Sequence, residues 1–221
     1  MTPDWLLYLI TDRQLASPRR LSDVVADAVK AGVRAVQLRE KDLPPRSLLE
    51  VATQLRRVTE AEGALLFIND RIDVAVAVGA DGIHLPSRSV PVDVVRRLVG
   101  PRTWIGVSTH SLDDVRVAVD GGANFVTFGP VFPTPSKLPY GQPVGLEKLA
   151  EAARYSSLPV FAVGGITPDR IASVLATGAF GVAMISEIMS KRDTLSAARA
   201  CLDALEAVRM GRSVDPSTGR C

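Results

Sequence analysis

The chain of 221 residues is poor in the side chains that most often build metal sites and disulfide frameworks. It contains two cysteines, Cys201 and Cys221, and two histidines, His84 and His110. Because one cysteine lies in a helical pattern and the other is the last residue, we expect no disulfide framework and a reducing, cytoplasmic environment. Two histidines alone exclude a histidine-rich metal site.

Strong net charge and long apolar runs are also missing. The 26 basic and 24 acidic residues leave a formal net charge of +2, and the basic residues are dispersed along the chain. This pattern excludes the basic patch of a nucleic-acid-binding protein. No uncharged apolar run is long enough to span a bilayer, and no charged segment followed by an apolar one marks a signal peptide. We therefore expect neither a nucleic-acid nor a membrane partner.

Short apolar runs rich in Val, Ile and Phe alternate with longer stretches in which apolar residues recur every three or four positions. The short runs predict strands that are buried on both faces, and the longer stretches predict amphipathic helices. The predicted strands are residues 7–11, 35–40, 64–70, 82–86, 104–109, 125–132, 160–165 and 181–186. The clearest helices are 21–32, 48–63, 111–122 and 169–178.

Eight strands alternating with helices in a chain of this length predict a single-domain α/β protein, a closed (β/α)₈ TIM barrel. An open doubly wound sheet is the alternative. We expect the barrel to occupy residues 1–210. Residues 211–221 show no periodicity and predict a disordered tail. Barrels often self-associate, so a homo-oligomer is an open alternative.

Polar residues gather where the predicted strands end. In a barrel of this type the carboxyl ends of all strands meet at one mouth, where active sites lie. The residues at these ends are Gln37, Arg39, Glu40 and Lys41, then Asn69 and Asp70, then Ser108, Thr109 and His110, then the loop 133–137, Gly164 and Gly165, and Ser186. The predicted mouth therefore carries polar groups at six strand ends.

The charged end of the second strand predicts an anion site. Alternation along a strand would place Gln37, Arg39 and Lys41 on one face, and Lys137 adds a further positive charge. Asp70 beside them is suited to Mg²⁺ that bridges to a diphosphate, since Mg²⁺ is bound by few carboxylates and by phosphate oxygens.

A second anion site is predicted across the mouth. Gly164 and Gly165 precede a helix that opens at Thr167, so exposed backbone N–H groups can bind a phosphate there. The turn at Ile185 and Ser186 offers further N–H groups, and barrels often bind phosphate in the loops after strands 7 and 8. Simpler structural interpretations are pairing of Arg39 and Lys41 with Glu40 and Asp42, capping of the next helix by Asp70, a capping box of Ser111 with Asp114, and packing of His84 and His110.

Seven motifs, in content and order, resemble those of the thiamine phosphate synthase family. They are "QLREK" (37–41), "NDR" (69–71), "GADGIHL" (79–85), "GVSTHS" (106–111), "GPVFPTPSK" (129–137), "VGGIT" (163–167) and "GVAMIS" (181–186). The resemblance extends from residue 6 to about residue 205. It implies a Mg²⁺-dependent transferase that joins 4-amino-5-hydroxymethyl-2-methylpyrimidine diphosphate to a hydroxyethylthiazole (carboxylate) phosphate. The products would be thiamine phosphate and pyrophosphate, formed by a dissociative substitution.

The resemblance also implies roles for individual residues. It implies that Asp70 binds Mg²⁺, and that Arg39, Lys41, Lys137 and Ser108 assist the reaction. The pyrimidine diphosphate would be bound by Gln37, Leu38, Arg39, Glu40, Lys41, Asn69, Ser108 and Lys137. The thiazole phosphate would be bound by Thr134, Pro135, Ser136, Gly165, Ile185 and Ser186.

The chain departs from the family pattern at "HLPSRS", residues 84–89. A second Mg²⁺-binding carboxylate of the family falls on Ser89, and a hydroxyl is a poor replacement for a carboxylate on this cation. The sequence of this segment resembles that of the related thiazole tautomerases, although Pro130 stands where those proteins can carry a catalytic histidine. A tautomerase acting on the thiazole carboxylate phosphate is therefore one alternative, and a non-catalytic barrel that binds thiamine precursors is another.

Overall fold

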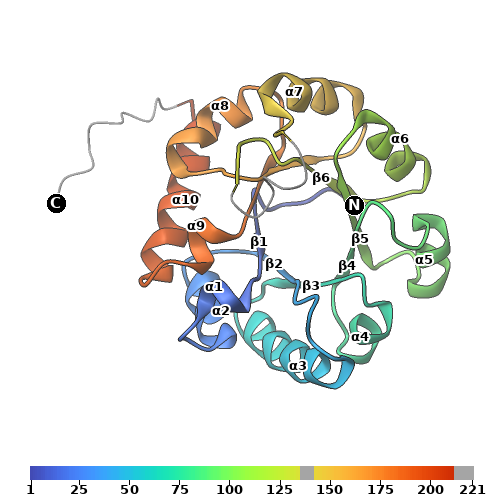
Figure 1. Ribbon diagram of the computed structural model, residues 1–221, viewed down its shortest axis with the longest axis vertical. Coiled ribbons are helices and arrows are strands. Elements are labelled where there is room, and N and C mark those ends of the chain that lie inside the picture. Colours follow the sequence, from blue (N-terminus) through green and yellow to red (C-terminus); the bar gives the residue numbers. More distant parts are fainter. Residues whose placement is uncertain (135–141, 212–221) are drawn as a thin grey trace.

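The computed structural model, which describes residues 1–134 and 142–211, is a closed barrel of eight parallel strands in chain order (Figure 1). It confirms the predicted single-domain (β/α)₈ fold. The strands are Leu7–Ile10 (β1), Ala35–Leu38 (β2), Leu65–Asn69 (β3), Gly82–Leu85 (β4), Trp104–Thr109 (β5), Phe125–Phe128 (β6), Val160–Val163 (β7) and Gly181–Met184 (β8).

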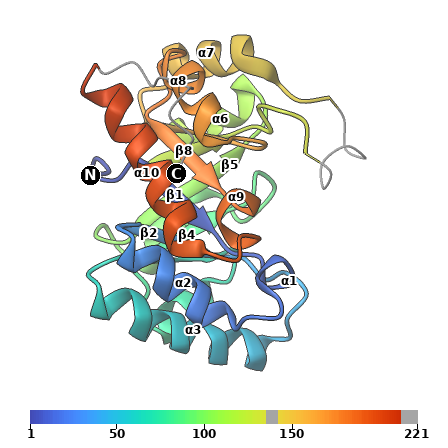
Figure 2. The same cartoon turned by 90° about the vertical axis from the view of Figure 1, so that its left-hand side faces the viewer.

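The helices surround the strands, and α2 packs between α3 and α10 on the side of β1 and β2 (Figure 2). Their bounds are Arg13–Ala16 (α1), Leu21–Lys30 (α2), Pro45–Ala61 (α3), Ile72–Ala77 (α4), Val92–Val99 (α5), Leu112–Asp120 (α6), Gly145–Tyr155 (α7), Ile171–Leu175 (α8), Ser186–Met189 (α9) and Thr194–Arg209 (α10), with a 3₁₀ turn at Pro168–Arg170 (η2). Within the described ranges no helix is long and apolar enough to cross a membrane. The predicted tail lies outside the described residues, apart from Gly211.

The sixth strand is shorter than the prediction of residues 125–132, because it ends at Phe128. Pro130 has no N–H group to continue the hydrogen-bond ladder. The chain instead crosses the end of β7, where the Val131 N–H donates to the Val163 carbonyl (2.9 Å) and the Phe132 N–H donates to the Gly164 carbonyl (3.1 Å). The segment after β6 is thereby held against the segment after β7.

The barrel interior is filled by aromatic rings that lie beside glycines of neighbouring strands. The inward-facing rings include Tyr8, Phe67, Phe125 and Phe161, and they are almost completely buried. The glycines that face them are Gly82, Gly106 and Gly181. A Cβ atom at Gly106 would lie 2.4 Å from Phe125 Cζ and 2.6 Å from His84 Nδ1, which is closer than packed atoms can approach.

A second apolar layer fills the space between the strands and the helices. It includes outward-facing strand residues such as Val36, Leu38 and Ile68, packed against helix residues such as Val25 and Leu55. Because the strands are buried on both faces, their sequences read as continuous apolar runs, which is the pattern that predicted them.

We expect Gly106→Ala to destabilise the protein by about 1–3 kcal/mol, because the added methyl group overlaps Phe125 and His84. Phe125→Leu in the same chain should relieve part of this overlap. Unfolding by denaturant would measure the two single variants and the double variant. Strictly additive losses would contradict the packing described here, which predicts a coupling of about 1 kcal/mol.

The thiol of Cys201 is buried against the barrel on α10, and burial raises its pKa to about 12. Since the thiolate is the reactive form, the native protein should not react with a thiol reagent at this position. A Cys221→Ser variant would leave Cys201 as the single thiol. We expect about one reactive thiol after denaturation and almost none before; rapid native labelling near neutral pH would refute this.

Candidate active site

The barrel brings the polar ends of five strands to one rim. Arg39, Asp70, Ser108, Gly165 and Ser186 lie at or just after the carboxyl ends of β2, β3, β5, β7 and β8. In a closed parallel barrel these ends lie on the same side of the molecule. The rim therefore combines a cation, a carboxylate, hydroxyls and a glycine turn from distant parts of the sequence.

The end of β2 differs from the predicted alternation, because the strand stops at Leu38. Gln37 faces the barrel interior and is 1% exposed, whereas Leu38 packs in the apolar layer beneath the helices. Arg39 and Lys41 lie beyond the strand, so strand geometry does not place them on the face of Gln37. The Leu38 side chain faces the helices, and its substrate contact stays a prediction.

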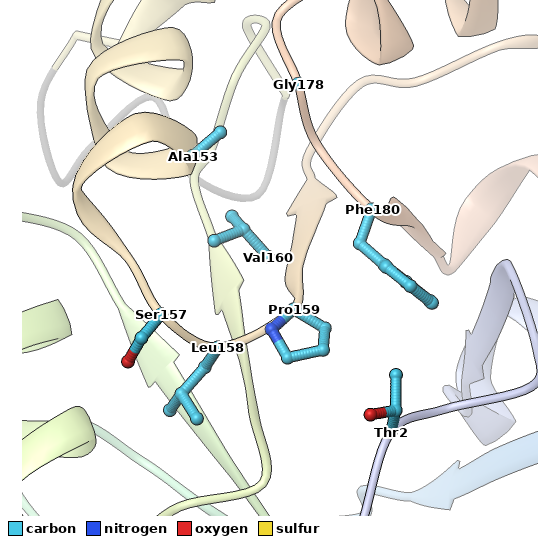
Figure 3. Close-up of a pocket in the computed structure, with 8 residues that line it drawn as sticks. All are labelled: Thr2, Ala153, Ser157, Leu158, Pro159, Val160, Gly178 and Phe180. Atoms are coloured by element: carbon cyan, nitrogen blue, oxygen red, sulfur yellow. The ribbon is translucent and has the colours of Figure 1, made fainter.

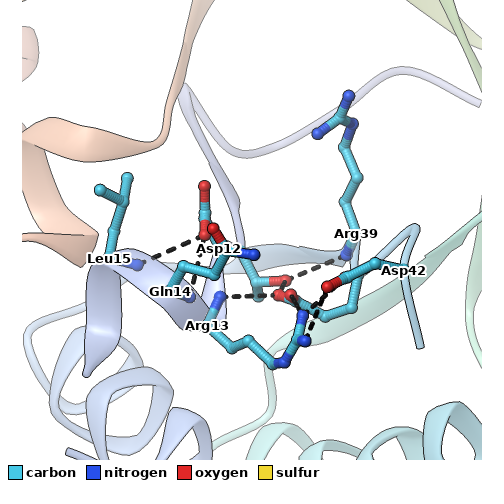
Figure 4. Close-up of polar contacts among 8 residues, drawn as sticks. Asp12, Arg13, Gln14, Leu15, Arg39 and Asp42 are labelled. Carbon is cyan, nitrogen blue, oxygen red and sulfur yellow. Dashed lines mark hydrogen bonds and ion pairs between the residues drawn. The ribbon is translucent and has the colours of Figure 1, made fainter. Parts of the chain in front are cut away.

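Arg13, the first residue of α1, holds Asp42 (Figure 4) and also binds Glu40. The buried Glu40 carboxylate also accepts hydrogen bonds from the Thr11 hydroxyl (2.8 Å) and the Arg13 N–H (3.0 Å). The guanidinium donates to both oxygens of Asp42 at 2.6 and 2.7 Å. These contacts give the Glu40 carboxylate a structural role, and its substrate contact stays a prediction. Among the described residues, neither carboxylate forms an ion pair with Arg39.

Arg39 keeps a guanidinium that makes no hydrogen bond or ion pair with the rest of the described chain. The backbone N–H of Arg39 donates to the Thr11 hydroxyl (3.0 Å), and the Arg39 side chain points away from the Arg13 cluster (Figure 4). Burial is the main reason that the pKa of His84 falls to about 3, and the Arg39 charge lowers that pKa further. A half-buried, unpaired cation at a barrel mouth is suited to an anion.

Asp70 is exposed immediately after β3, and its backbone has a φ of +63°. Its N–H donates to the His84 carbonyl (3.0 Å), and the Ser89 hydroxyl donates to its Oδ1 (2.5 Å). Asp70 does not cap α4, since the residue at the N-cap is Arg71 and no side chain caps that helix. Its carboxylate therefore faces Ser89, the position where the resemblance implies a second carboxylate.

The Asp70 carboxylate and the Ser89 hydroxyl fit a Mg²⁺ ion only where most of its other ligands are not protein groups. Across the part of the chain that the structure describes, no group of three or more His, Cys, Asp or Glu side chains could form a metal cage. One carboxylate is sufficient where water and substrate phosphates supply the other ligands. The donor set at Asp70 and Ser89 agrees with that arrangement.

His84 joins a buried polar chain in the barrel interior beneath the rim. Gln37 Nε2 donates to Tyr8 Oη (3.2 Å), and Tyr8 Oη lies 3.3 Å from His84 Nδ1. His84 Nε2 lies 3.0 Å from Ser108 Oγ and 3.5 Å from Thr127 Oγ1. Sequence reasoning did not identify Tyr8 or Thr127. The feature that could have identified them is their place on strands that pair with those of Gln37 and Ser108: Tyr8 lies on β1 beside β2, and Thr127 pairs with Ser108.

His110 and the helix after it have structural roles, in agreement with the simpler interpretation. Ser111 and Asp114 form a capping box at the start of α6. His110 Nδ1 contacts the Gly129 carbonyl (2.5 Å), and the backbone N–H of His110 donates to the Asp114 carboxylate (2.8 Å). These contacts connect the end of β5 to the segment after β6.

The glycine turn after β7 is in close contact with the segment that follows β6. Gly164 and Gly165 have φ values of +102° and +64°. A Cβ atom on Gly165 would lie 2.8 Å from Phe132 Cβ and 3.0 Å from the Pro133 carbonyl oxygen. Arg170 donates to the Gly165 carbonyl (2.6 Å) and lies 4.6 Å from the centre of the Phe132 ring. The two loops predicted to bind the thiazole phosphate are therefore adjacent.

The structure describes only some of the other residues that are predicted to bind the thiazole phosphate. Ile185 is half-buried and Ser186 is the exposed first residue of α9. The Thr134 hydroxyl is buried and has no hydrogen-bond partner among residues 1–134 and 142–211. Pro135, Ser136 and Lys137 lie outside the described residues, so their predicted contacts remain predictions.

A cavity of about 300 Å³ lies at the opposite, N-terminal end of the barrel (Figure 3). Its lining is mostly apolar and includes Leu158, Pro159 and Phe180, with hydroxyls from Thr2 and Ser157 and no charged side chain. It lacks the positive charge needed to bind an anion, so we place the candidate active site at the C-terminal rim.

An anion-binding rim at this end of a closed barrel is typical of (β/α)₈ enzymes that bind phosphorylated small molecules. A profile of the thiamine monophosphate synthase family matches residues 7–188, and the chain belongs to this family. This match confirms the family predicted from the sequence motifs.

Individual relatives agree with this assignment. The chain is 52% identical over 202 residues to a putative thiamine-phosphate synthase of Geobacter sulfurreducens, covering 91% of this chain and 95% of the relative. It is 43% identical to a thiamine-phosphate synthase of Roseiflexus sp., covering 88% and 83%. A thiamine phosphate pyrophosphorylase from Pyrococcus furiosus superposes with a TM-score of 0.83 at 37% identity, covering 92% and 96%. The relatives support the predicted synthase rather than the tautomerase.

We expect Arg13→Met to destabilise the protein by about 1–3 kcal/mol, because it leaves the buried Glu40 carboxylate without its cation. Arg97→Met is the matched control, since Arg97 and Asp93 form an exposed pair worth less than about 1 kcal/mol. Denaturant unfolding would compare the two variants. Equal effects would argue against the structural role of Arg13.

Proposed function

We propose that this chain is a thiamine-phosphate synthase. It joins 4-amino-5-hydroxymethyl-2-methylpyrimidine diphosphate to hydroxyethylthiazole phosphate, or to its carboxylate, and releases pyrophosphate. Membership of the family supports the reaction. The observation that carries the assignment to this site is the Arg39 guanidinium, which pairs with no described residue and lies on the same rim as the Gly164 and Gly165 turn.

The reaction transfers the pyrimidine methylene group from oxygen to nitrogen. The carbon–oxygen bond to the diphosphate breaks, its electron pair leaves with pyrophosphate, and the resulting pyrimidine methyl cation is trapped by the lone pair of the thiazole nitrogen. Charge develops on the leaving oxygen, so preorganised cations and donors around it lower the barrier. Arg39, Lys41, Lys137 and Ser108 are the residues that we propose for this role.

The second task of the site is to hold the thiazole nitrogen close to the developing cation. Anchoring the thiazole phosphate converts an encounter between two substrates into a reaction within one complex. We propose Thr134, Gly165, Ile185 and Ser186 as this anchor, together with Pro135 and Ser136. The close packing of Gly165 against Phe132 and Pro133 supports the proposal, because it joins the two loops that would surround one phosphate.

No protein nucleophile or general base is required by this chemistry. The thiazole nitrogen supplies the attacking electron pair, and pyrophosphate leaves as an anion. The buried His84, whose pKa lies far below neutrality, is not placed to exchange protons with solvent during turnover.

We propose that Asp70 holds Mg²⁺, with the Ser89 hydroxyl beside it. A magnesium ion bound there would supply positive charge against the diphosphate oxygens. Asn69, the last residue of β3, is proposed to contact the pyrimidine substrate from the rim, and Gln37 from the barrel interior beneath it. Because only one carboxylate is present, we expect the protein alone to bind Mg²⁺ weakly and the complex with diphosphate to bind it more tightly.

The tautomerase and the non-catalytic barrel remain distinguishable alternatives. The residues 86–89 motivate the tautomerase, which would isomerise the thiazole carboxylate phosphate without any pyrimidine substrate. A binding protein would retain phosphorylated precursors without converting them. An assay with both substrates and Mg²⁺, followed by chromatography, should yield thiamine phosphate; absence of product above background would eliminate the synthase.

Two further proposals concern the surroundings of the enzyme. The scarcity of cysteine and the burial of Cys201 support a location in the cytoplasm. The fold class supports self-association, for which light scattering on the purified protein is the direct measurement.

We expect Arg39→Gln to lower kcat/KM by at least about 100-fold, since it removes a cation from the proposed leaving-group site. Arg102→Gln is the control, because Arg102 is exposed in the loop before β5, at the other end of the barrel. The steady-state kinetics of the two variants would be compared once denaturant unfolding has shown that their midpoints agree. A normal rate for Arg39→Gln would remove Arg39 from the site.

Ser89→Asp should strengthen Mg²⁺ binding by about tenfold, because it places a second carboxylate against Asp70. Titration calorimetry with MgCl₂, with and without pyrophosphate, would measure the affinity. Ser87→Asp adds the same charge in the same exposed loop and controls for general attraction of cations. Similar affinities for the two variants would refute a specific site at Asp70.

A further inference from the structure

The four side chains of Gln37, Tyr8, His84 and Ser108 form a continuous chain of polar contacts across the barrel. The chain runs from β2 through β1 and β4 to β5, with separations of 3.2, 3.3 and 3.0 Å. Gln37, Tyr8 and His84 are each at most 1% exposed. Because buried donors and acceptors must be satisfied internally, the direction of each hydrogen bond constrains the next.

The first two members determine which nitrogen of His84 carries a hydrogen. Gln37 Nε2 is a donor only, so Tyr8 Oη accepts at this contact. The single hydrogen of the Tyr8 hydroxyl is then directed to its other neighbour, His84 Nδ1. His84 Nδ1 is therefore the bare, accepting nitrogen.

The rest of the imidazole follows from its neutrality. His84 is buried, and in the described part of the chain no carboxylate contacts its ring. A neutral imidazole carries one N–H group, which must be on Nε2 when Nδ1 accepts. Nε2 is the nitrogen that faces Ser108 Oγ (3.0 Å) and, at a longer distance, Thr127 Oγ1 (3.5 Å).

We propose that His84 is a positioning residue that makes the Ser108 hydroxyl a hydrogen-bond donor toward the phosphorylated substrate. Ser108 Oγ accepts from His84 Nε2, so its own hydrogen is directed to the half-exposed side of Ser108, at the mouth. The inference rests on the proposed function for the identity of the anion that receives this hydrogen bond. The orientation of the hydroxyl itself does not depend on that function.

The direction of these hydrogen bonds has a consequence for catalysis. With the reverse direction, Ser108 would donate to His84 and present lone pairs to a diphosphate, which repels them. With the direction proposed here, a fixed donor faces the oxygen on which negative charge develops. Tyr8 and Gln37, which lie deeper in the barrel, thereby determine whether Ser108 attracts or repels the leaving group.

The tautomer can be measured directly, because His84 and His110 are the only histidines of the chain. Protein labelled with ¹⁵N-histidine, without substrates, would be studied by long-range ¹H–¹⁵N correlation. A His110→Asn variant would assign the signals. We expect a protonated Nε2 and a bare Nδ1 for His84, and an increased share of the Nδ1–H form in Tyr8→Phe. A wild-type His84 protonated on Nδ1 would overturn the proposal whether or not the enzyme makes thiamine phosphate.

Two isosteric variants test whether the Nε2 donor matters for turnover. The amide nitrogen of His84→Gln can replace Nε2, whereas that of His84→Asn reaches only the position of Nδ1. We expect His84→Gln to retain kcat within about tenfold and His84→Asn to lose about 100-fold. Equal losses in the two variants would refute the proposed role.

A double-mutant cycle with Ser108→Ala separates this role from a general structural one. If His84 acts through Ser108, His84→Asn should cause little further loss of kcat once the hydroxyl is absent. Losses that multiply would place the effect of His84 elsewhere and overturn the proposal. Should the His84 variants fail to fold, Tyr8→Phe in the same cycle and the wild-type tautomer keep the test decisive.

Discussion

The close packing of aromatic rings against glycines inside the barrel is the constraint on which the rest of the structure depends. Phe125 and His84 occupy the space beside Gly106, and Phe67 occupies the space beside Gly82. A closed barrel of eight strands has an interior just large enough for side chains, so each large ring needs a small neighbour. This pairing sets the height of each strand against the next, and therefore decides which residues reach the rim.

The distribution of charge at the rim follows from one arginine that does not belong to the predicted site. Arg13 binds Glu40 and Asp42, and the Thr11 hydroxyl connects Glu40 to the N–H of Arg39. The acidic neighbours of Arg39 in sequence are thus occupied, and its own guanidinium makes no ion pair with a described residue. A positive charge that is not neutralised by the protein is what a diphosphate-binding site needs. The structural ion pairs and the proposed catalytic cation are parts of one arrangement.

Beneath the rim, the polar chain that includes His84 connects the rigid interior to the exposed hydroxyl of Ser108. On the other side, Arg170 and Phe132 hold the turn at Gly165 against the segment after β6. Both features place groups of the proposed site on supports that are themselves buried or stacked. Such support favours fixed donors, which stabilise developing charge without reorganising during the reaction.

Local patterns in the sequence determined the eight strands, the main helices and the capping box at Ser111, because apolar periodicity and capping act over a few residues. The motifs also identified the family, and the fold placed Arg39, Asp70, Ser108 and Gly165 at one end of the barrel. Only the tertiary structure decided that β2 ends at Leu38, that Arg13 binds Glu40, and that Tyr8 contacts His84. These outcomes join residues 27 and 76 positions apart in the chain. Such contacts depend on strand register and on the packing of side chains across a closed interior, which no short stretch of sequence contains.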